Sequence, residues 1–351
     1  MASIHIRKGA LLKHTVALNA MNDGDGPQSY FQNSSYQGGA VDITKPIIEE
    51  EIATKLDDVV QHLASTFYIA DFGCSTGRNS FPAIQFITQA IKQKLKTSSP
   101  KIPEFQVLFN DALYRAAAVR DFHGRLLPES SLHFGYSSWS LQWLTEVPKA
   151  VADRDSPAWN RGRVYCTRER KDVCDAYLNQ FGNEVESFLE ARAVEMVSGG
   201  LMAIIVPGEP EFWNPETEYT IPCEINLFGS CLMDMSKKGR FSESKVDSFN
   251  FPFYLPTPQQ LKVILERSQS FSIERMEILN NPGKYTLPSV DARAVVYRAV
   301  LGRLLTDHFG SEILDELFEL YTKKIAASPI FQNPDNVKTI TVLAVLKRKM
   351  D

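Results

Sequence analysis

Short apolar stretches typical of strands alternate along this chain with longer stretches typical of helices, and this alternation constrains the fold more than any other feature. FYIADFG (67–73) precedes FPAIQFITQAIKQKL (81–95), FQVLFND (105–111) follows, and the helical stretch 172–200 leads into LMAIIVP (201–207). Strands separated by helices pair in parallel rather than as hairpins, with helices on both faces of the sheet. The sequence therefore predicts an α/β fold around a mostly parallel sheet.

The alternation is absent at the N-terminus and is interrupted once later. Residues 1–40 are irregular and rich in Gly, Asn, Ser and Gln, and from 209 to 270 helical segments are separated by proline turns. FSIERMEIL and TITVLAVLKRK then resume the strand pattern. We predict an N-terminal arm (1–40), an α/β core (41–208 and 271–351) and a helical cap (209–270) that roofs a pocket.

Composition narrows the partners and the compartment. The net charge of −4 with scattered basic residues argues against nucleic acid as a partner. No run approaches the roughly 20 apolar residues of a membrane helix, and the first residues lack a signal-peptide pattern. The five cysteines form no CxxC pair, which fits a reducing compartment. We expect a cytoplasmic protein without a membrane or nucleic-acid partner.

A glycine turn, DFGCSTG (71–77), follows the first strand. Gly73 and Gly77 allow a ligand to approach the backbone, but the third glycine of GxGxxG is missing, which disfavours a redox dinucleotide. Asp71 ends the first strand and Asp111 the second, and two such acids suit the ribose of a nucleoside without a pyrophosphate. S-adenosylmethionine is such a nucleoside. The turn alone is equally compatible with a structural strand-to-helix connection.

Six motifs in one order identify a family. They are SYFQNSSYQ (29–37), ADFGCSTGRN (70–79), FND (109–111), GRLLPESSLHFGYSSWSLQWLTEVP (124–148), WNRGRVY (159–165) and VDSFNFPFYLPTPQQL (246–261). Together they resemble the SABATH family of plant methyltransferases over about residues 21–349, with most likeness to the branch around loganic acid methyltransferase. The resemblance implies a class I methyltransferase (Rossmann-like) fold, a seven-stranded sheet with an α-helical cap, and usually a homodimer. It also implies transfer of the methyl group of S-adenosylmethionine to a small acid or a ring nitrogen.

The resemblance further assigns residues to a site. Those implied at the donor are Tyr30, Ser34, Asp71, Gly73, Cys74, Asn79, Asp111, Asp121, Phe122, Ser138 and Trp139. Those implied at the substrate are Gln37, Trp139, Gln142, Trp143, Ile225 and Phe228, with Gln37 and Trp143 positioning the acceptor group. For several of these residues a purely structural role is an alternative to ligand binding. Trp139 and Trp143 are spaced to pack on one helix face, and a glutamine in a polar arm is usually solvated.

The chemistry implied by the family demands little of the side chains. A carboxylate is already ionised at neutral pH and a sulfonium is an activated donor, so no general base is required. The chain accordingly has only six histidines and no evident Ser/His/Asp arrangement. We expect the enzyme to act by holding the reacting atoms in line, which can supply up to roughly 7–11 kcal/mol.

The family pattern also includes a weak magnesium site. Its positions here are Asn160, Asp247, Phe249 and Asn250. Magnesium prefers hard oxygen ligands, and a phenylalanine offers only its carbonyl. We expect this group to be structural, or at most a weak Mg²⁺ site.

The sequence departs from the family at several points. The segment between Asp111 and Phe122 is short, so either the loop is deleted or residues are missing from the sequence, and Arg78 replaces a proline with no evident purpose. Ile225 occupies a place often held by tryptophan, which widens the pocket toward a terpenoid or glycosylated acid. Gln142 stands where many members have histidine, which fits an acid or a ring nitrogen. The leading hypothesis is carboxyl methylation of a small-molecule plant acid; the alternatives are N-methylation of a xanthine or alkaloid, and a catalytically silent binding protein.

Overall fold

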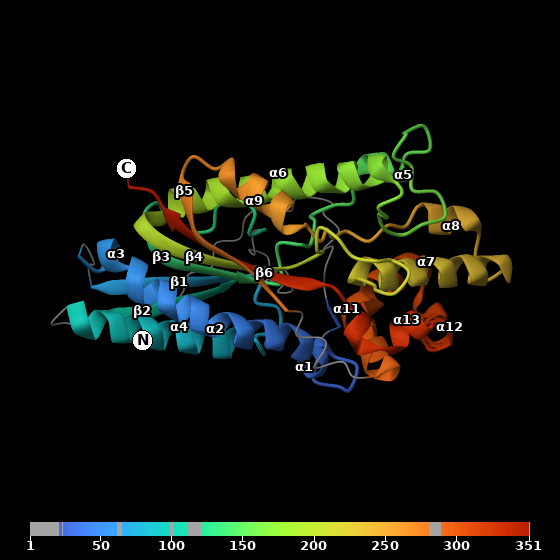
Figure 1. Ribbon diagram of the computed structural model, residues 1–351, viewed down its shortest axis with the longest axis horizontal. Coiled ribbons are helices and arrows are strands. Elements are labelled where there is room, and N and C mark those ends of the chain that lie inside the picture. Colours follow the sequence, from blue (N-terminus) through green and yellow to red (C-terminus); the bar gives the residue numbers. More distant parts are fainter. Residues whose placement is uncertain are drawn as a thin grey trace, which may run out of the picture.

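The computed structural model describes residues 21–22, 24–61, 65–98, 102–110, 121–280 and 289–350. Within them six strands form one sheet in the order β2-β1-β3-β4-β6-β5 (Figure 1). The strands are β1 (Thr66–Phe72), β2 (Glu104–Asn110), β3 (Leu132–Ser138), β4 (Met196–Gly208), β5 (Phe271–Leu279) and β6 (Ile340–Arg348). Strands β1 to β4 pair in parallel, whereas β6 runs antiparallel to both β4 and β5. The α/β fold with a mostly parallel sheet is therefore confirmed.

The sheet of the described residues has six strands, where the family resemblance implied seven. Strand β2 forms one edge of the sheet, and β5 forms the other. The described part of the connection from β2 to β3, residues 121–131, runs in turns and bends rather than as a further strand. The class of fold does not depend on this difference, because the direction and order of the strands at the centre of the sheet are unaffected.

Helices cover both faces of the sheet. Figure 1 shows α2, α3 and α4 on one side and α6 and α9 on the other. The helices before and around the sheet are α1 (Tyr30–Asn33), α2 (Ser35–Lys55), α3 (Asp57–Gln61), α4 (Ser80–Ser98), α5 (Lys149–Ala152), α6 (Lys171–Glu195) and α9 (Pro258–Glu266). Because both faces are covered, the central strands are mostly buried, as their continuous apolar runs predict.

Strand β4 shows how one strand serves two cores. Leu201, Ala203 and Ile205 belong to the cluster shared with α2 and α4. Their neighbours Met202 and Ile204 belong to the cluster shared with α6. Successive side chains of a strand point to opposite faces, so one apolar run fills both layers.

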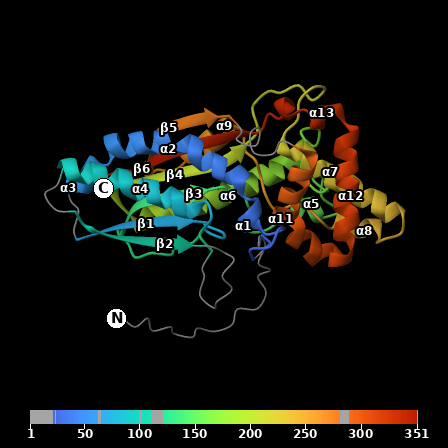
Figure 2. The ribbon, with the colours of Figure 1, turned by 90° about the horizontal axis from the view of Figure 1, so that it is seen from below.

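A helical layer stands at one end of the sheet. Figures 1 and 2 both place α7, α8, α11, α12 and α13 together there. These elements are α7 (Ile221–Lys237), α8 (Glu243–Asp247), α11 (Val290–Phe309), η1 (Ser311–Ile313), α12 (Leu314–Ala327), α13 (Pro329–Gln332) and η2 (Pro334–Asn336). Phe228 of α7 stacks on Tyr321 of α12 with ring centroids 4.2 Å apart. None of the helices in the described ranges combines the length and apolar character needed to cross a bilayer.

This packing bears on the expected cap, 209–270. Helix α9 lies within those limits but packs against α6 and β5, on the sheet. Helices α11 and α12 follow β5 in the sequence but pack against each other, with α12 against α7. We therefore propose a cap made of α7, α8 and the helices between β5 and β6, in place of 209–270 alone. The assignment of helices to this cap rests on contacts between elements that are far apart in the sequence, and sequence periodicity does not predict such contacts.

Candidate functional site

The glycine turn lies at the carboxyl ends of β1 and β2. Gly73 and Gly77 have φ of 88° and 79°, in the left-handed region that favours glycine. A Cβ on Gly73 would lie 2.2 Å from the Cβ of Ser140, so no side chain fits there. The N–H groups of Gly73 and Cys74 donate to the carbonyl of Asn110 at 2.7 and 3.1 Å. The turn is thus fastened to the end of β2 on one side and to the loop after β3 on the other.

Asp71 is buried at the last part of β1, between two neighbouring strands. Its Cα is in register with Phe109 of β2 and with Tyr136 of β3. Asp111, the second predicted acid, lies outside the described residues. The carboxyl edge of a parallel sheet is where ligands bind in open α/β folds, so Asp71 stands where the prediction requires it.

The N-terminal helices dock on this turn. The side-chain amide of Asn79 donates to the carbonyl of Ser34 at 3.0 Å. Arg78 donates to the carbonyl of Phe31, and its guanidinium lies 5.7 Å from the centroid of the Phe31 ring. Arg78, unexplained by sequence, therefore fastens α1 to the glycine turn.

Phe122 closes the other side of the turn. Its ring lies 3.6 Å from the place that a Cβ on Gly73 would occupy. The carbonyls of Phe122 and Gly124 accept hydrogen bonds from Arg192 at 2.6 and 2.8 Å. Arg192 is fully buried and pairs with the equally buried Glu195 at 2.7 Å. A buried ion pair thus holds the Phe122 segment beside the turn.

Asp121, predicted beside the adenine, has a hydrogen-bond partner within the protein. Its Oδ1 lies 2.7 Å from Nδ1 of His123, and its side chain is 56% exposed. Burial alone would raise the pKa of Asp121, but the hydrogen bond and charge of His123 outweigh it and hold that pKa below its usual range. The carboxylate therefore has His123 as a partner, and the Phe122 ring lies beside the turn. A contact of Asp121 with the adenine stays a prediction.

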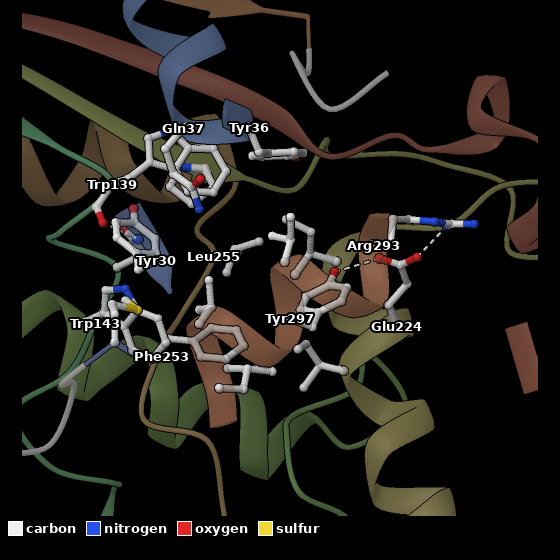
Figure 3. Close-up of a pocket in the computed structure, with 18 of the residues that line it drawn as sticks. Tyr30, Tyr36, Gln37, Trp139, Trp143, Glu224, Phe253, Leu255, Arg293 and Tyr297 are labelled. Atoms are coloured by element: carbon white, nitrogen blue, oxygen red, sulfur yellow. Dashed lines mark hydrogen bonds and ion pairs between the residues drawn. The ribbon is translucent and has the colours of Figure 1, made fainter. Parts of the chain in front are cut away.

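A pocket lies between the N-terminal helices, the loop after β3 and the helical layer (Figure 3). Its walls come from α1, α2, the loops after β3 and β4, α7 and α11. The residues that line it are Met21, Tyr30, Tyr36, Gln37, Trp139, Gln142, Trp143, Pro207, Tyr219, Ile221, Glu224, Ile225, Phe253, Leu255, Arg293, Val296, Tyr297, Val300, Leu301 and Val337. Most are apolar or aromatic, with a few convergent polar groups, which is the usual composition of a small-molecule site.

Three polar atoms of this pocket are buried and unmatched. Gln37 Oε1, Trp139 Nε1 and Gln142 Oε1 have no hydrogen-bond partner among the described residues. A buried polar atom without a partner costs free energy, so these atoms fit a ligand that supplies donors and acceptors. This end of the pocket can therefore orient a polar group.

The loop after β3 presents Trp139 to the pocket in an unusual conformation. Trp139 has φ of 56°, and its carbonyl accepts from Gln142 Nε2 at 2.7 Å. Its ring meets the ring of Tyr36 edge-on, with centroids 5.0 Å apart. Residues 139–143 form a turn, so the alternative of two tryptophans on one helix face is wrong. The Gln142 amide N–H is used to hold this turn, which leaves its oxygen toward the pocket.

The far end of the pocket carries a second polar group. Arg293 Nη1 donates to Glu224 Oε1 at 2.5 Å and to the Tyr219 hydroxyl at 2.7 Å. Tyr297 donates to Glu224 Oε2 at 2.6 Å. Burial raises the pKa of Glu224 even though Arg293 opposes that shift, and burial with the Glu224 charge raises the pKa of Tyr297 well above its usual range. We call Tyr219, Glu224, Arg293 and Tyr297 the far-end cluster.

The structure brings most of the predicted residues together. Tyr30, Gln37, Trp139, Gln142, Trp143 and Ile225 line the pocket. Ser34, Asp71, Gly73, Cys74, Asn79, Phe122 and Ser138 surround the turn and the adjoining strand ends. Phe228 does not line the pocket, because its fully buried ring faces α12. It is a core residue rather than a substrate contact.

The far-end cluster was missed by sequence reasoning. Glu224 and Arg293 are 69 positions apart and lie on different helices. No spacing rule joins two such positions. The one available signal is an acidic residue inside the apolar stretch of α7, directly before Ile225.

The predicted metal positions have structural partners. Asn160 Nδ2 donates to Asn250 Oδ1 at 2.8 Å, and Asp247 Oδ1 accepts from the N–H of Gly162 at 2.8 Å. The Phe249 ring packs on Phe251 at 4.9 Å. Asn160 Oδ1 has no partner among the described residues, whereas the one carboxylate of the set is engaged and Phe249 offers only its carbonyl. The weak Mg²⁺ site stays a prediction, and the described residues hold no group of three or more His, Cys, Asp or Glu suited to a metal. These positions join two loops.

Comparisons with known proteins agree with this architecture. A family model described as SAM-dependent carboxyl methyltransferase matches residues 17–115 and 112–349. The chain is 38% identical over 358 residues to loganic acid O-methyltransferase of Catharanthus roseus, covering 96% of each protein. It is 36% identical over 324 residues to farnesoic acid carboxyl-O-methyltransferase of Arabidopsis thaliana, covering 87% of this chain and 91% of that protein. A solved structure of loganic acid methyltransferase with SAH (S-adenosylhomocysteine) matches with a TM-score of 0.87 at 38% identity, covering 95% of this chain and 99% of that one.

Proposed function

The chain belongs to the SABATH family of S-adenosylmethionine-dependent carboxyl methyltransferases, and on that premise we propose that its substrate is an isoprenoid acid. It is an enzyme that uses S-adenosylmethionine to form the methyl ester of a small-molecule acid. Two relatives are named for loganic acid and farnesoic acid, both isoprenoid acids. The observation that carries the proposal is the mostly apolar pocket that runs from Gln37 and Trp139 to α7 and α11.

We propose that the donor is held at the turn. Gly73 lets the backbone come close, the Phe122 ring lies beside the turn, and the Trp139 ring lines the adjacent pocket. Aromatic faces tolerate a cation, which suits the sulfonium from which the donor supplies its methyl group. Asp111 remains the predicted acceptor for the ribose hydroxyls, and Asp71, buried on β1, is the second predicted acid.

We propose that the substrate carboxylate lies at the near end of the pocket. Trp139 Nε1 is an unmatched donor there, and the Gln37 side chain stands beside it (Figure 3). Trp143 would fix the carbon skeleton from the opposite wall. No residue has to remove a proton, because the carboxylate is ionised at neutral pH. The residues act by orienting the acid and excluding water, which reduces the entropic part of the barrier.

Labelled S-adenosylmethionine tests the reaction. We expect radiolabel to be transferred to an isoprenoid acid such as geranic or farnesoic acid, and to be released by mild base because esters hydrolyse. Label that survives base on a xanthine or alkaloid would support N-methylation, for which the Gln142 oxygen is a suitable acceptor. If calorimetry detects no S-adenosylhomocysteine binding by the intact chain, the hypothesis of a catalytically silent binding protein replaces both methylation hypotheses.

We also propose a cytoplasmic homodimer. The family resemblance supports the dimer, and the five cysteines, all free among the described residues, suit a reducing compartment. Light scattering on the purified chain tests the assembly: a mass of one chain at micromolar concentration would contradict it.

A further inference from the structure

The far end of the pocket is polar although the wall leading to it is apolar. Figure 3 shows Gln37, Trp139 and Trp143 at one end, Leu255 between, and Glu224, Arg293 and Tyr297 at the other. All four members of the far-end cluster line the pocket, and Glu224 and Arg293 are only 3% and 7% exposed. An acid that filled this pocket would meet polar groups at both ends and apolar side chains along its middle.

We propose, on the basis of the proposed function, that the far-end cluster is a subsite for a hydroxyl group at the end of the substrate remote from its carboxylate. The substrate class is then a hydroxylated acid with an apolar middle. Its carboxylate lies beside Trp139 and its hydroxyl beside Glu224, Arg293 and Tyr297. Nothing in the reaction itself requires this second polar end, so the subsite determines specificity rather than chemistry.

The charges of the cluster favour a neutral ligand group. Glu224 and Arg293 form a close ion pair, so the cluster carries no net charge. A second carboxylate would stand beside Glu224, and an ammonium beside Arg293, and each would add a like charge in a buried place. The cluster therefore selects against a charged group at this end.

The remaining hydrogen-bonding capacity fits a hydroxyl. A guanidinium has five N–H donors, and Arg293 uses three contacts, to Glu224, Tyr219 and the carbonyl of Phe331. Each oxygen of Glu224 accepts one bond, which leaves acceptor capacity. A hydroxyl both donates and accepts, so it can use Glu224 and Arg293 together, whereas an alkyl end can use neither.

The cluster also joins elements of the cap, and this structural role has to be separated from recognition. Arg293 links α11 to α7 through Glu224 and to α13 through Phe331. Replacing Arg293 would leave a buried carboxylate alone and weaken the fold. Tyr297→Phe is the sharper variant, because it removes one hydroxyl from the pocket wall and keeps the ring.

Tyr321→Phe is the matched control. Tyr321 lies 5.8 Å from Tyr297 between ring centroids and is fully buried. Its hydroxyl has no hydrogen-bond partner among the described residues, and it does not line the pocket. Both variants lose a tyrosine hydroxyl in the same cap, but Tyr297→Phe alone changes the proposed subsite.

The experiment compares geranic and farnesoic acids with the same acids hydroxylated at the end remote from the carboxylate. We expect the wild type to prefer the hydroxylated member of at least one pair by roughly ten- to hundredfold in kcat/KM, the range of a hydrogen bond to a charged group. Tyr297→Phe should reduce that preference severalfold, and Tyr321→Phe should leave it unchanged. Both variants should bind S-adenosylhomocysteine as the wild type does.

The outcomes separate the two proposals. Ester formation with no preference in either pair overturns the subsite and leaves the proposed function intact. Equal loss of preference in both variants also overturns it, because the effect would then come from the fold of the cap. If the chain binds S-adenosylhomocysteine but methylates none of the acids, the proposed function fails, and the subsite fails with it. If Tyr297→Phe does not fold, Glu224→Gln, which keeps the shape, must show the same reduced preference.

Discussion

At Gly73 the absence of a side chain decides whether the chain can turn out of β1. Its left-handed φ is unfavourable for other residues, and the adjacent Ser140 leaves no room for a Cβ. Sequence analysis identified this glycine from its place after a strand. It could not identify Ser140 as the neighbour, because that contact depends on the fold.

Gly73→Ala should cost both stability and donor affinity. We expect about 1–2 kcal/mol from the backbone conformation and a further 1–3 kcal/mol from overpacking against Ser140. Calorimetry with S-adenosylhomocysteine should show at least tenfold weaker binding, and urea unfolding should report the loss of stability.

Gly239→Ala provides the control for this prediction. Gly239 also has a left-handed φ, of 80°, but a Cβ there would meet nothing within 4 Å. Its variant should show the backbone cost alone and unchanged donor affinity. Equal effects in the two variants would contradict the role given to the close contact with Ser140.

Trp139 shows a different limit of sequence reasoning. Its spacing from Trp143 suggested a helix face, yet the chain turns there and Trp139 adopts a positive φ. A hydrogen bond from Gln142 to the Trp139 carbonyl accompanies that conformation. Side-chain to backbone bonds of this kind compete with helix formation, and periodicity does not register them.

At the scale of elements, the Phe122 segment depends on α6. Arg192 and Glu195, near the end of that helix, bond to the chain from Phe122 to Leu127. The sequence indicates the helix through its apolar periodicity. A buried ion pair at its end is not predictable from that pattern, since charged residues are usually on a solvated face.

Arg192→Met should destabilise the protein by about 3–5 kcal/mol, because it leaves the Glu195 charge buried without its partner. Donor affinity should fall as well, since the carbonyls of Phe122 and Gly124 lose their donor. Urea unfolding and calorimetry measure the two effects.

Arg163→Met serves as the comparison for that experiment. Arg163 pairs with Glu169 at 3.2 Å, and their side chains are 41% and 80% exposed. Exposed pairs contribute about 0–1 kcal/mol, so this variant should be nearly neutral. A loss of similar size in both variants would refute the importance of burial at Arg192.

At the scale of the whole molecule, His133 makes stability depend on pH. Its Nδ1 accepts the N–H of Tyr68 at 3.1 Å, between β3 and β1. Burial lowers the pKa of His133 to about 4. The unfolded chain, with a pKa near 6.5, therefore binds a proton that the native protein does not bind between these two values.

The free energy of unfolding should accordingly fall as the pH drops from about 6.5 to about 4, by at most roughly 3 kcal/mol from this residue. Urea unfolding at a series of pH values measures that slope. His133→Gln should be less stable than the wild type at pH 7. Because glutamine does not titrate, the free energy of unfolding of this variant should also depend less steeply on pH. Parallel slopes for the two proteins would assign the pH dependence to other groups.

Sequence patterns foresaw the layered α/β core better than the cap. Apolar runs in the sequence predict strands such as β4, and apolar side chains fill both faces of the sheet, as those runs require. The cap gave no comparable signal, because α7 and α12 meet through residues such as Phe228 and Tyr321, which are far apart in sequence. The near end of the pocket was predicted by family resemblance, and the far end came only from the fold.

The position of β6 has a consequence for synthesis. The strand closest to the C-terminus is inserted between β4 and β5, so among the described strands β5 joins the sheet only through residues 340–348. A ribosome delivers those residues after β4 and β5, at roughly 5–20 residues per second. Until residues 340–348 have been made, β4 is open on one edge and β5 lacks its partner among the described strands.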